Sequence, residues 1–309
     1  MLSILRLYRY IRPTLFFLIG MSLLIGCSSL RNEVDPAMLG VQPTKLVVSC
    51  FISPQDTTLA VKVTRSNTVV GDSISLLQTG NNVTNATVTL AEGSKSVVLP
   101  YNNVVKGDTV KSRLYYSVNA RLLPIVVGHT YTLTVVVNGE RVSSSCTIPA
   151  AVPLTSITLD SLSRRYYVLA RWQDPAGQAN YYQVAGIFRY ITSTCKACQN
   201  ESYSTLSFDD DNRGLFDDAG VDGREKVSGK AYLTPSATNN FYNQYKTASV
   251  TVNLMSVDQS FYRFQEAVIR QRRSRNNPFA EPVLIPSNIE GGLGCFAGYN
   301  NATKTLTLK

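Results

Sequence analysis

Residues 128–140 read GHTYTLTVVVNGE, and this stretch decides the fold class of the chain. Apolar side chains occupy every second position from Tyr131 to Val137, which is the period of a β-strand with one buried face. Asn138 and Gly139 follow, and both tolerate the positive φ angles that a two-residue hairpin requires. The stretch therefore predicts a strand that ends in a tight hairpin.

Strand-like stretches continue on both sides of this hairpin over residues 44–149. Apolar and polar residues also alternate at 59–63 and 86–90, and glycine, asparagine and aspartate separate the expected strands. Several short strands at regular spacing indicate a β-sandwich of the immunoglobulin-like or transthyretin-like kind. Pro149 and Pro153 end this first domain.

Residues 150–309 are less regular and predict a second β-rich domain. An amphipathic helix is expected near 258–275, because Asp258 can cap it and apolar residues recur there at the spacing of one buried face. Asn276 to Pro278 would stop this helix. Strands are expected at 166–172, 181–191, 202–208 and 248–257.

The first 26 residues predict a secretory signal peptide. Three arginines precede an apolar run that is shorter than the roughly 20 residues of a spanning helix. Residues 24–27 read LIGC and resemble the bacterial lipobox, in which the cysteine is lipidated after cleavage. We therefore expect a diacylated and N-acylated Cys27, with palmitate among its chains. A core cysteine behind another cleavage site is the alternative, but no Ala-x-Ala-like site lies nearby.

Residues 27–43 are mostly polar and predict a tether between the lipid and the first domain. Ser28 stands where an aspartate would retain a lipoprotein in the inner membrane, so we expect a lipid-anchored protein of the outer membrane. The sequence leaves the periplasmic and the surface face open and favours the surface.

Composition is that of a folded globular protein, with 44% hydrophobic and 17% charged residues. Removal of residues 1–26 leaves 283 residues, a length that fits two modest domains. It also lowers the net charge from +9 to +6, because three arginines lie in the signal peptide. A moderate and dispersed positive charge gives no indication of nucleic-acid binding.

Five cysteines remain besides the lipidated one, in an envelope compartment where disulfides persist. Cys50 and Cys146 lie in strand-like stretches at the two ends of the first domain, so a disulfide between them and two separately buried thiols are the alternatives. Cys195 and Cys198 have the spacing of a redox or zinc motif, but the helical setting and a second Cys-x-x-Cys are missing. We interpret this pair as a short structural disulfide.

Several stretches of the mature chain carry a family resemblance: LVV at 46–48, NATVTL at 85–90, GHTYTL at 128–133, CTIP at 146–149, NPF at 277–279 and SNIEGGLGCF at 287–296. Together they resemble the domain-of-unknown-function 4249 family of Bacteroidota lipoproteins, and the last stretch is the most specific. The resemblance implies an outer-membrane lipoprotein, often encoded near TonB-dependent receptors, with no established activity. No catalytic residue comes with it.

Catalytic groups are scarce, because His129 is the only histidine and stands where a surface turn is expected. The densest acidic stretch resembles a calcium loop, since Asp209 and Asp211 fall at its first and third positions and Asp217 follows. Arg213 stands where a ligand belongs, however, and a solvated acidic loop is the alternative. We expect no cofactor unless Ca²⁺ binds here, and no enzymatic activity.

Arg270, Arg272 and Arg273 crowd the end of the expected helix, where they could bind phosphates of lipopolysaccharide or an acidic partner surface. Solvated charges that complement the helix dipole are the alternative. We therefore expect a non-catalytic accessory or binding subunit associated with a TonB-dependent transporter. A carbohydrate-acting enzyme that uses the acidic 209–222 loop, and a structural envelope protein, are the other two hypotheses.

Overall fold

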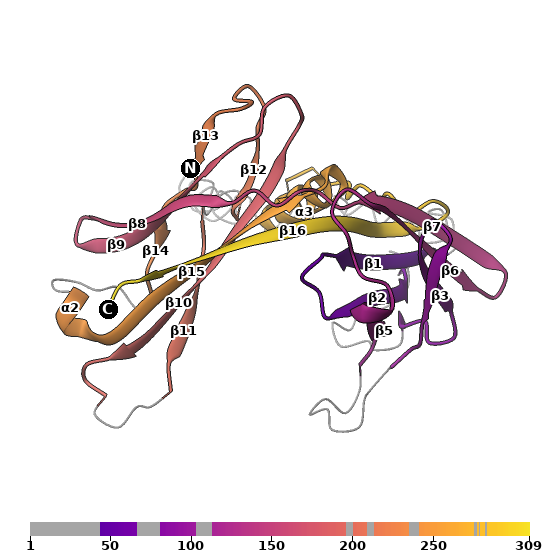
Figure 1. Ribbon diagram of the computed structural model, residues 1–309. Coiled ribbons are helices and arrows are strands. Elements are labelled where there is room, and N and C mark those ends of the chain that lie inside the picture. Colours follow the sequence, from indigo (N-terminus) through magenta and orange to yellow (C-terminus); the bar gives the residue numbers. More distant parts are fainter. Residues whose placement is uncertain are drawn as a thin grey trace, which may run out of the picture. The chain divides into compact units, whose positions relative to one another are not determined.

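Strands dominate the computed structural model (Figure 1), which confirms the expected mainly β fold. The signal peptide, Cys27 and the tether lie outside the described residues. Among the residues that are described, no helix is long and apolar enough to cross a membrane. The structure describes residues 44–66, 81–102, 113–195, 200–208, 213–234, 241–274, 277, 279–281 and 283–309.

Two sheets contribute side chains to the first hydrophobic core. The hairpin predicted from the alternating stretch is present: side chains of β6 alternate between buried and exposed, and the turn residues Asn138 and Gly139 have φ angles of 49° and 82°. One sheet has the order β4 (Lys95–Leu99), β3 (Thr87–Glu92), β6 (Thr130–Val137) and β7 (Glu140–Thr147). The other contributes β1 (Leu46–Ile52), β2 (Thr58–Arg65) and β5 (Tyr116–Asn119).

The C-terminal strand β16 (Leu293–Thr307) lies between β1 and β15 and so extends this second sheet into one large sheet. Its first part pairs in parallel with β1, and its second part pairs antiparallel with β15 (Tyr245–Val257). Ile289 and Phe296 are buried in the first core, so residues 44–149 do not complete that core by themselves. Strands β15 and β16 run side by side as neighbouring ribbons in Figure 1.

Glycine makes the close approach of β16 to β1 possible. Gly294 has a φ angle of 114°, and a Cβ atom there would lie 1.9 Å from the carbonyl oxygen of Val48. The turn before the strand is confined to Gly291 and Gly292, and Gly294 already belongs to the strand.

The second core lies between the other half of the large sheet and a smaller sheet. Trp172 is completely buried in it. Beyond β15 the large sheet continues with β10 (Tyr181–Thr192), β11 (Ser202–Leu206) and β12 (Leu215–Asp217). The smaller sheet contains β8 (Leu154–Leu162), β9 (Arg165–Gln173), β13 (Glu225–Val227) and β14 (Ala231–Tyr232).

The predicted helix is present as α3 (Gln259–Ser274). Asp258 caps it as expected, because its Oδ1 accepts the N–H of Phe261 at 2.8 Å. The other carboxylate oxygen accepts the N–H of Gly298 at 2.8 Å and so fixes the helix start to β16. The rings of Phe261 and Phe51 lie 5.2 Å apart, which seats the helix against β1.

Candidate functional site

A pocket of about 540 Å³ lies where the chain passes from the first core to the second. Three segments line it: the end of β7 with the following linker, the loop between β9 and β10, and the junction of β15 with α3. The lining is mixed, with apolar groups such as Ile148 and Val257 beside the side chains of Gln178 and Tyr181. A site of this kind suits a small ligand that has both apolar and hydrogen-bonding groups.

Hydrogen bonds fix the wall formed by α3. Asp258, which lines the pocket, is held by the N–H groups of Phe261 and Gly298. Burial raises the pKa of this carboxyl group, and the backbone N–H groups counteract the rise. Gln259 donates from Nε2 to the hydroxyl oxygen of Tyr181 at 2.8 Å. These contacts hold Tyr181 and the start of α3 in fixed positions at the pocket.

Three carboxylates gather beside the wall formed by the loop between β9 and β10. Oxygen atoms of Asp174, Asp218 and Asp222 all lie within 4.8 Å of one another, and the first two side chains are buried. Asp174 accepts the hydroxyl of Tyr182 at 2.5 Å and the N–H of Gly223 at 2.9 Å. Burial followed by the hydrogen bond to Asp174 raises the pKa of Tyr182.

The carboxylates hold two loops together. Asp218 accepts the N–H of Asn180 at 2.8 Å, and Asp222 accepts the N–H of Gly177 at 3.1 and 3.0 Å. Asn180 also lines the pocket, so the acidic group fixes the shape of this wall. Carboxylate oxygens are the ligands that Ca²⁺ prefers. No Lys, Arg or His of the described residues forms an ion pair with the three aspartates.

The acidic group differs from the calcium loop expected from the sequence. Asp209 and Asp211 lie outside the described residues. Asp217 points elsewhere, where its side chain accepts the hydroxyl of Tyr262 at 3.2 Å. Sequence reasoning missed Asp174, because it precedes the acidic stretch by more than thirty residues and only the fold brings it near.

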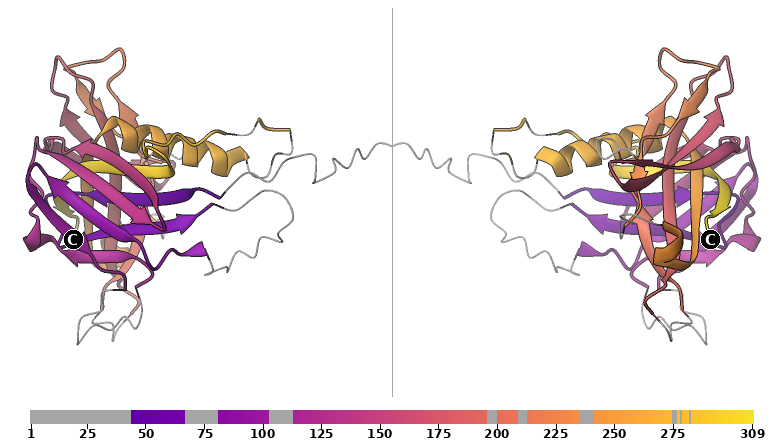
Figure 2. Two further views of the ribbon diagram at one scale, coloured as in Figure 1. Left: turned by 90° about the vertical axis from the view of Figure 1, so that its right-hand side faces the viewer. Right: turned by 90° about the vertical axis from the view of Figure 1, so that its left-hand side faces the viewer.

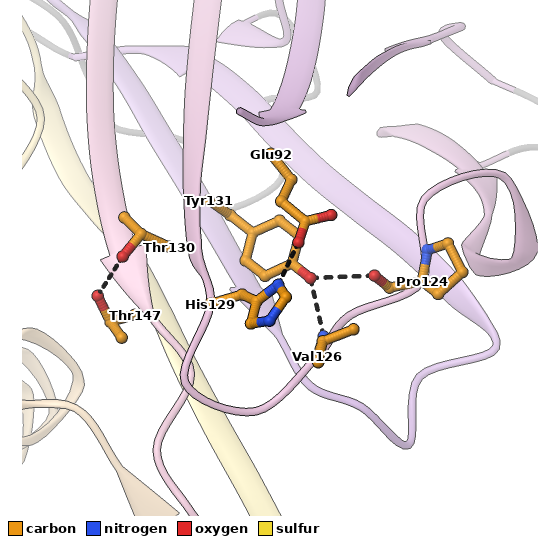
Figure 3. A network of polar contacts seen from close by, with 7 residues as sticks. All are labelled: Glu92, Pro124, Val126, His129, Thr130, Tyr131 and Thr147. Carbon is orange, nitrogen blue, oxygen red and sulfur yellow. Dashed lines mark hydrogen bonds and ion pairs between the residues drawn. The ribbon is translucent and has the colours of Figure 1, made fainter. Parts of the chain in front are cut away.

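His129 directly precedes β6, and its Nδ1 contacts the Glu92 carboxylate (Figure 3). Its backbone carbonyl oxygen accepts the N–H of Ile148, a residue of the pocket lining, at 3.1 Å. Beside it, Tyr131 donates its hydroxyl to the Pro124 carbonyl at 3.0 Å and accepts the N–H of Val126 at 2.8 Å. Burial raises the pKa of Tyr131. This network fastens the loop before β6 to the first core.

The disulfide considered between Cys50 and Cys146 is absent, and both are free, buried thiols. Each packs in the first hydrophobic core, on β1 and β7 respectively. Cys295 is also free, on the side of β16 that faces α3. Burial raises the pKa of all three thiols, that of Cys295 to about 12, so they are protonated and unreactive at neutral pH.

Cys195 is disulfide-bonded. Cys198, its expected partner, lies outside the described residues, so this pairing stays a prediction. Lys246, on β15, donates from Nζ to the carbonyl oxygen of Cys195 at 2.5 Å and ties the loop to the large sheet.

The predicted arginine cluster lies where the sequence placed it. Arg270, Arg272 and Arg273 are exposed in the last turns of α3. In the chain segment that follows, Phe279 is 94% and Leu284 90% exposed. Exposed apolar side chains of this size next to arginines are a signal that sequence alone did not give, because solvent exposure depends on the fold.

The sequence model of one family, described as "Domain of unknown function (DUF4249)", matches residues 31–305. A search of curated proteins found no match. Among solved structures, the crystal structure of CBD12 from CALX1.2 is similar at 9% identity, covering 82% of this chain and 99% of its own, with a TM-score of 0.18.

Proposed function

The chain belongs to the DUF4249 family, and within this family of unknown function we propose that it is a lipid-anchored binding or accessory protein of the outer membrane. Cys27 carries the lipid and residues 27–43 connect it to the folded part. Stable anchoring by a cysteine with more than one acyl chain follows from the roughly 0.8 kcal/mol that each buried methylene contributes. The partner in this proposal is a TonB-dependent transporter.

The pocket is the observation that supports a binding role. Its volume of about 540 Å³ falls in the range of small-molecule sites, roughly 300 to 1,000 Å³. Its walls are held by buried and half-buried carboxylates that accept backbone N–H groups, so little ordering is needed when a ligand enters. A preformed pocket on an anchored module suits capture of a ligand for a neighbouring transporter.

A pair of neighbouring alanines offers a matched test of the pocket. Ala150 lines it, whereas Ala151 is exposed and does not. The native protein would be captured from detergent-solubilised outer membranes, and its bound proteins and extractable small molecules would be identified by mass spectrometry. We expect a β-barrel transporter and a small molecule to co-purify with the native chain and with Ala151→Trp.

The pocket-filling variant Ala150→Trp is expected to lose the small molecule and to keep the transporter. Retention of the molecule by Ala150→Trp would mean that the pocket is not its site. Repeated absence of any barrel protein from native captures would exclude the accessory role. Circular dichroism of both variants checks that the strands are intact.

A further inference from the structure

We infer that the end of α3 and the segment after it make a second contact with the bilayer, by binding anionic lipid head groups. The surface consists of Arg270, Arg272, Phe279 and Leu284, and is called the basic apolar surface below. The inference rests on the lipid anchor of the proposed function, because that anchor brings the surface to a membrane. It does not depend on the pocket.

The apolar part of this surface is unusually exposed. Phe279 and Leu284 are 94% and 90% exposed, and they exceed every other large apolar side chain of the described residues; the next, Tyr203, is 73% exposed. Large apolar groups that a fold leaves in water mark interaction sites. At a membrane such side chains enter the boundary between head groups and acyl chains.

The charged part of the surface has the sign that anionic lipids attract. Arg270 and Arg272 are exposed and, within the described part of the chain, take part in no ion pair. Guanidinium groups bind phosphate oxygens in a bidentate manner, and an arginine near an anionic bilayer strengthens binding about fivefold. Glu281 is the one acidic residue of the described segment between Phe279 and Leu284.

Short contacts hold Phe279 near the end of α3 that carries the arginines. Asn277 donates its N–H to the carbonyl oxygen of Ser274, the last residue of α3, at 2.9 Å. Phe279 donates its N–H to Oδ1 of Asn277 at 3.0 Å. The chain therefore turns directly at the helix end and keeps the phenylalanine near the last turn. Packing of Phe261 and Phe264 on Phe51 fixes the helix itself.

Strand pairing places the start of β1, which follows the tether in the chain, at the same end of the sheet as the start of β16. β1 and β16 are parallel, and Val47 is paired with Leu293. Lys45 and Gly292, which precede β1 and β16, therefore lie at the same end of the sheet. Figure 2 shows the C-terminal end of α3 directed toward the side where β1 begins. The 18 residues from Cys27 to Thr44 are joined by 17 peptide bonds and can span at most about 60 Å.

Vesicle binding tests the inference without the lipid. The mature chain with Cys27→Ser keeps every other residue, and it would be sedimented with vesicles of phosphatidylethanolamine and phosphatidylglycerol, or of phosphatidylcholine alone. We expect binding to the anionic vesicles. Removal of both charges in Arg270→Gln/Arg272→Gln is expected to weaken it about 25-fold, at about fivefold for each arginine. Phe279→Ser/Leu284→Ser is expected to weaken it on both kinds of vesicle.

Exposed residues elsewhere provide the matched controls. Arg121 and Leu122 lie in a short 3₁₀ helix of the first domain, and Leu122 is 67% exposed. Arg121→Gln and Leu122→Ser are expected to leave vesicle binding unchanged. Equal binding to anionic and neutral vesicles, or equal loss in the control variants, would overturn the inference.

An acidic protein partner would give a different pattern. In that case the Arg270→Gln/Arg272→Gln variant would bind vesicles like the parent chain but would no longer capture the barrel protein, and the lipid contact would be rejected. The lipid anchor is tested separately, by sedimentation with membranes. The anchor is refuted if Cys27→Ala sediments with membranes as the native protein does. The role of the pocket is tested by whether Ala150→Trp still binds the small molecule when the protein is captured from solubilised membranes.

Discussion

Replacement of Gly294 by alanine is the sharpest test of how the fold is assembled. The new Cβ atom would lie 1.9 Å from the Val48 carbonyl oxygen and 2.8 Å from its carbonyl carbon. Real Cβ atoms essentially never come closer than 3.0 Å to another heavy atom, so β16 would have to move away from β1 by about 1 Å. This movement weakens the hydrogen bonds between β1 and β16, whose pairing places Phe296 in the first core.

The expected loss follows from two terms. An alanine at a φ angle of 114° carries backbone strain of about 1 to 3 kcal/mol. Weakening of two ladder hydrogen bonds adds about 2 kcal/mol, at about 1 kcal/mol each. We expect a decrease of about 4 kcal/mol in the free energy of unfolding, which corresponds to about 8 to 16 °C in Tm for a chain of this size.

Urea unfolding followed by tryptophan fluorescence is the appropriate assay. Trp172 is the only tryptophan of the chain and is completely buried in the second core. Because β16 also pairs with β15, the Trp172 transition should move together with the circular dichroism signal of the strands. A shift of circular dichroism without a shift of fluorescence would show that β16 does not couple the two cores.

Gly93 provides the matched control. It also has a positive φ angle, of 55°, but an added Cβ would meet no atom within 4 Å. Gly93→Ala is therefore expected to cost only the local strain, about 1 kcal/mol. If Gly294→Ala costs no more than Gly93→Ala, the close seating of β16 on β1 is wrong.

Three further predictions concern the anchor and the buried carboxylates. Cys27→Ala is expected to move the protein from the membrane to the soluble fraction while the circular dichroism spectrum stays native; a protein that still sediments with membranes would refute lipidation at this residue. Asp222→Asn is expected to raise the Tm slightly in the presence of EDTA, because it removes one of three neighbouring charges while the amide oxygen can still accept the N–H of Gly177; a lower Tm would mean that these charges do not repel one another in the folded chain. Burial raises the pKa of Asp56 in the folded state, against hydrogen bonds from Tyr299 and Ser53 that lower it, so its contribution to stability is fully present below the unfolded value near 3.8 and is lost as the pH rises through the folded pKa. The native chain should therefore lose stability relative to Asp56→Asn between about pH 4 and neutrality, as measured by urea unfolding across this range, and a difference that does not change with pH would contradict the shift.

Local signals account for the elements that the sequence predicted correctly. The strand that ends at Val137 needs only its alternation and the Asn138–Gly139 turn. Helix α3 needs only its apolar stripe and the cap at Asp258. Both patterns extend over only a few consecutive residues, so they can be recognised from the sequence without knowledge of the tertiary structure.

The site depends on contacts that are distant in the chain. Asp174 meets Asp218 and Asp222 only because the loops around them are brought to one wall of the pocket. The pocket itself is lined by segments from 147 to 259, which no local pattern connects. The sequence allowed either a disulfide between Cys50 and Cys146 or two separate thiols. In the folded structure both are free thiols.

The hairpin of residues 128–140 was thus determined by the sequence alone, together with the mainly β class and the helix near the C-terminus. The tertiary structure alone decided where β16 goes. Its sequence, LGCFAGYNNATKTLT, does not alternate cleanly, because its two parts have different neighbours. Hydrogen bonds from β1 on one side and β15 on the other stabilise this strand. Its position therefore depends on the residues of its partners as well as on its own.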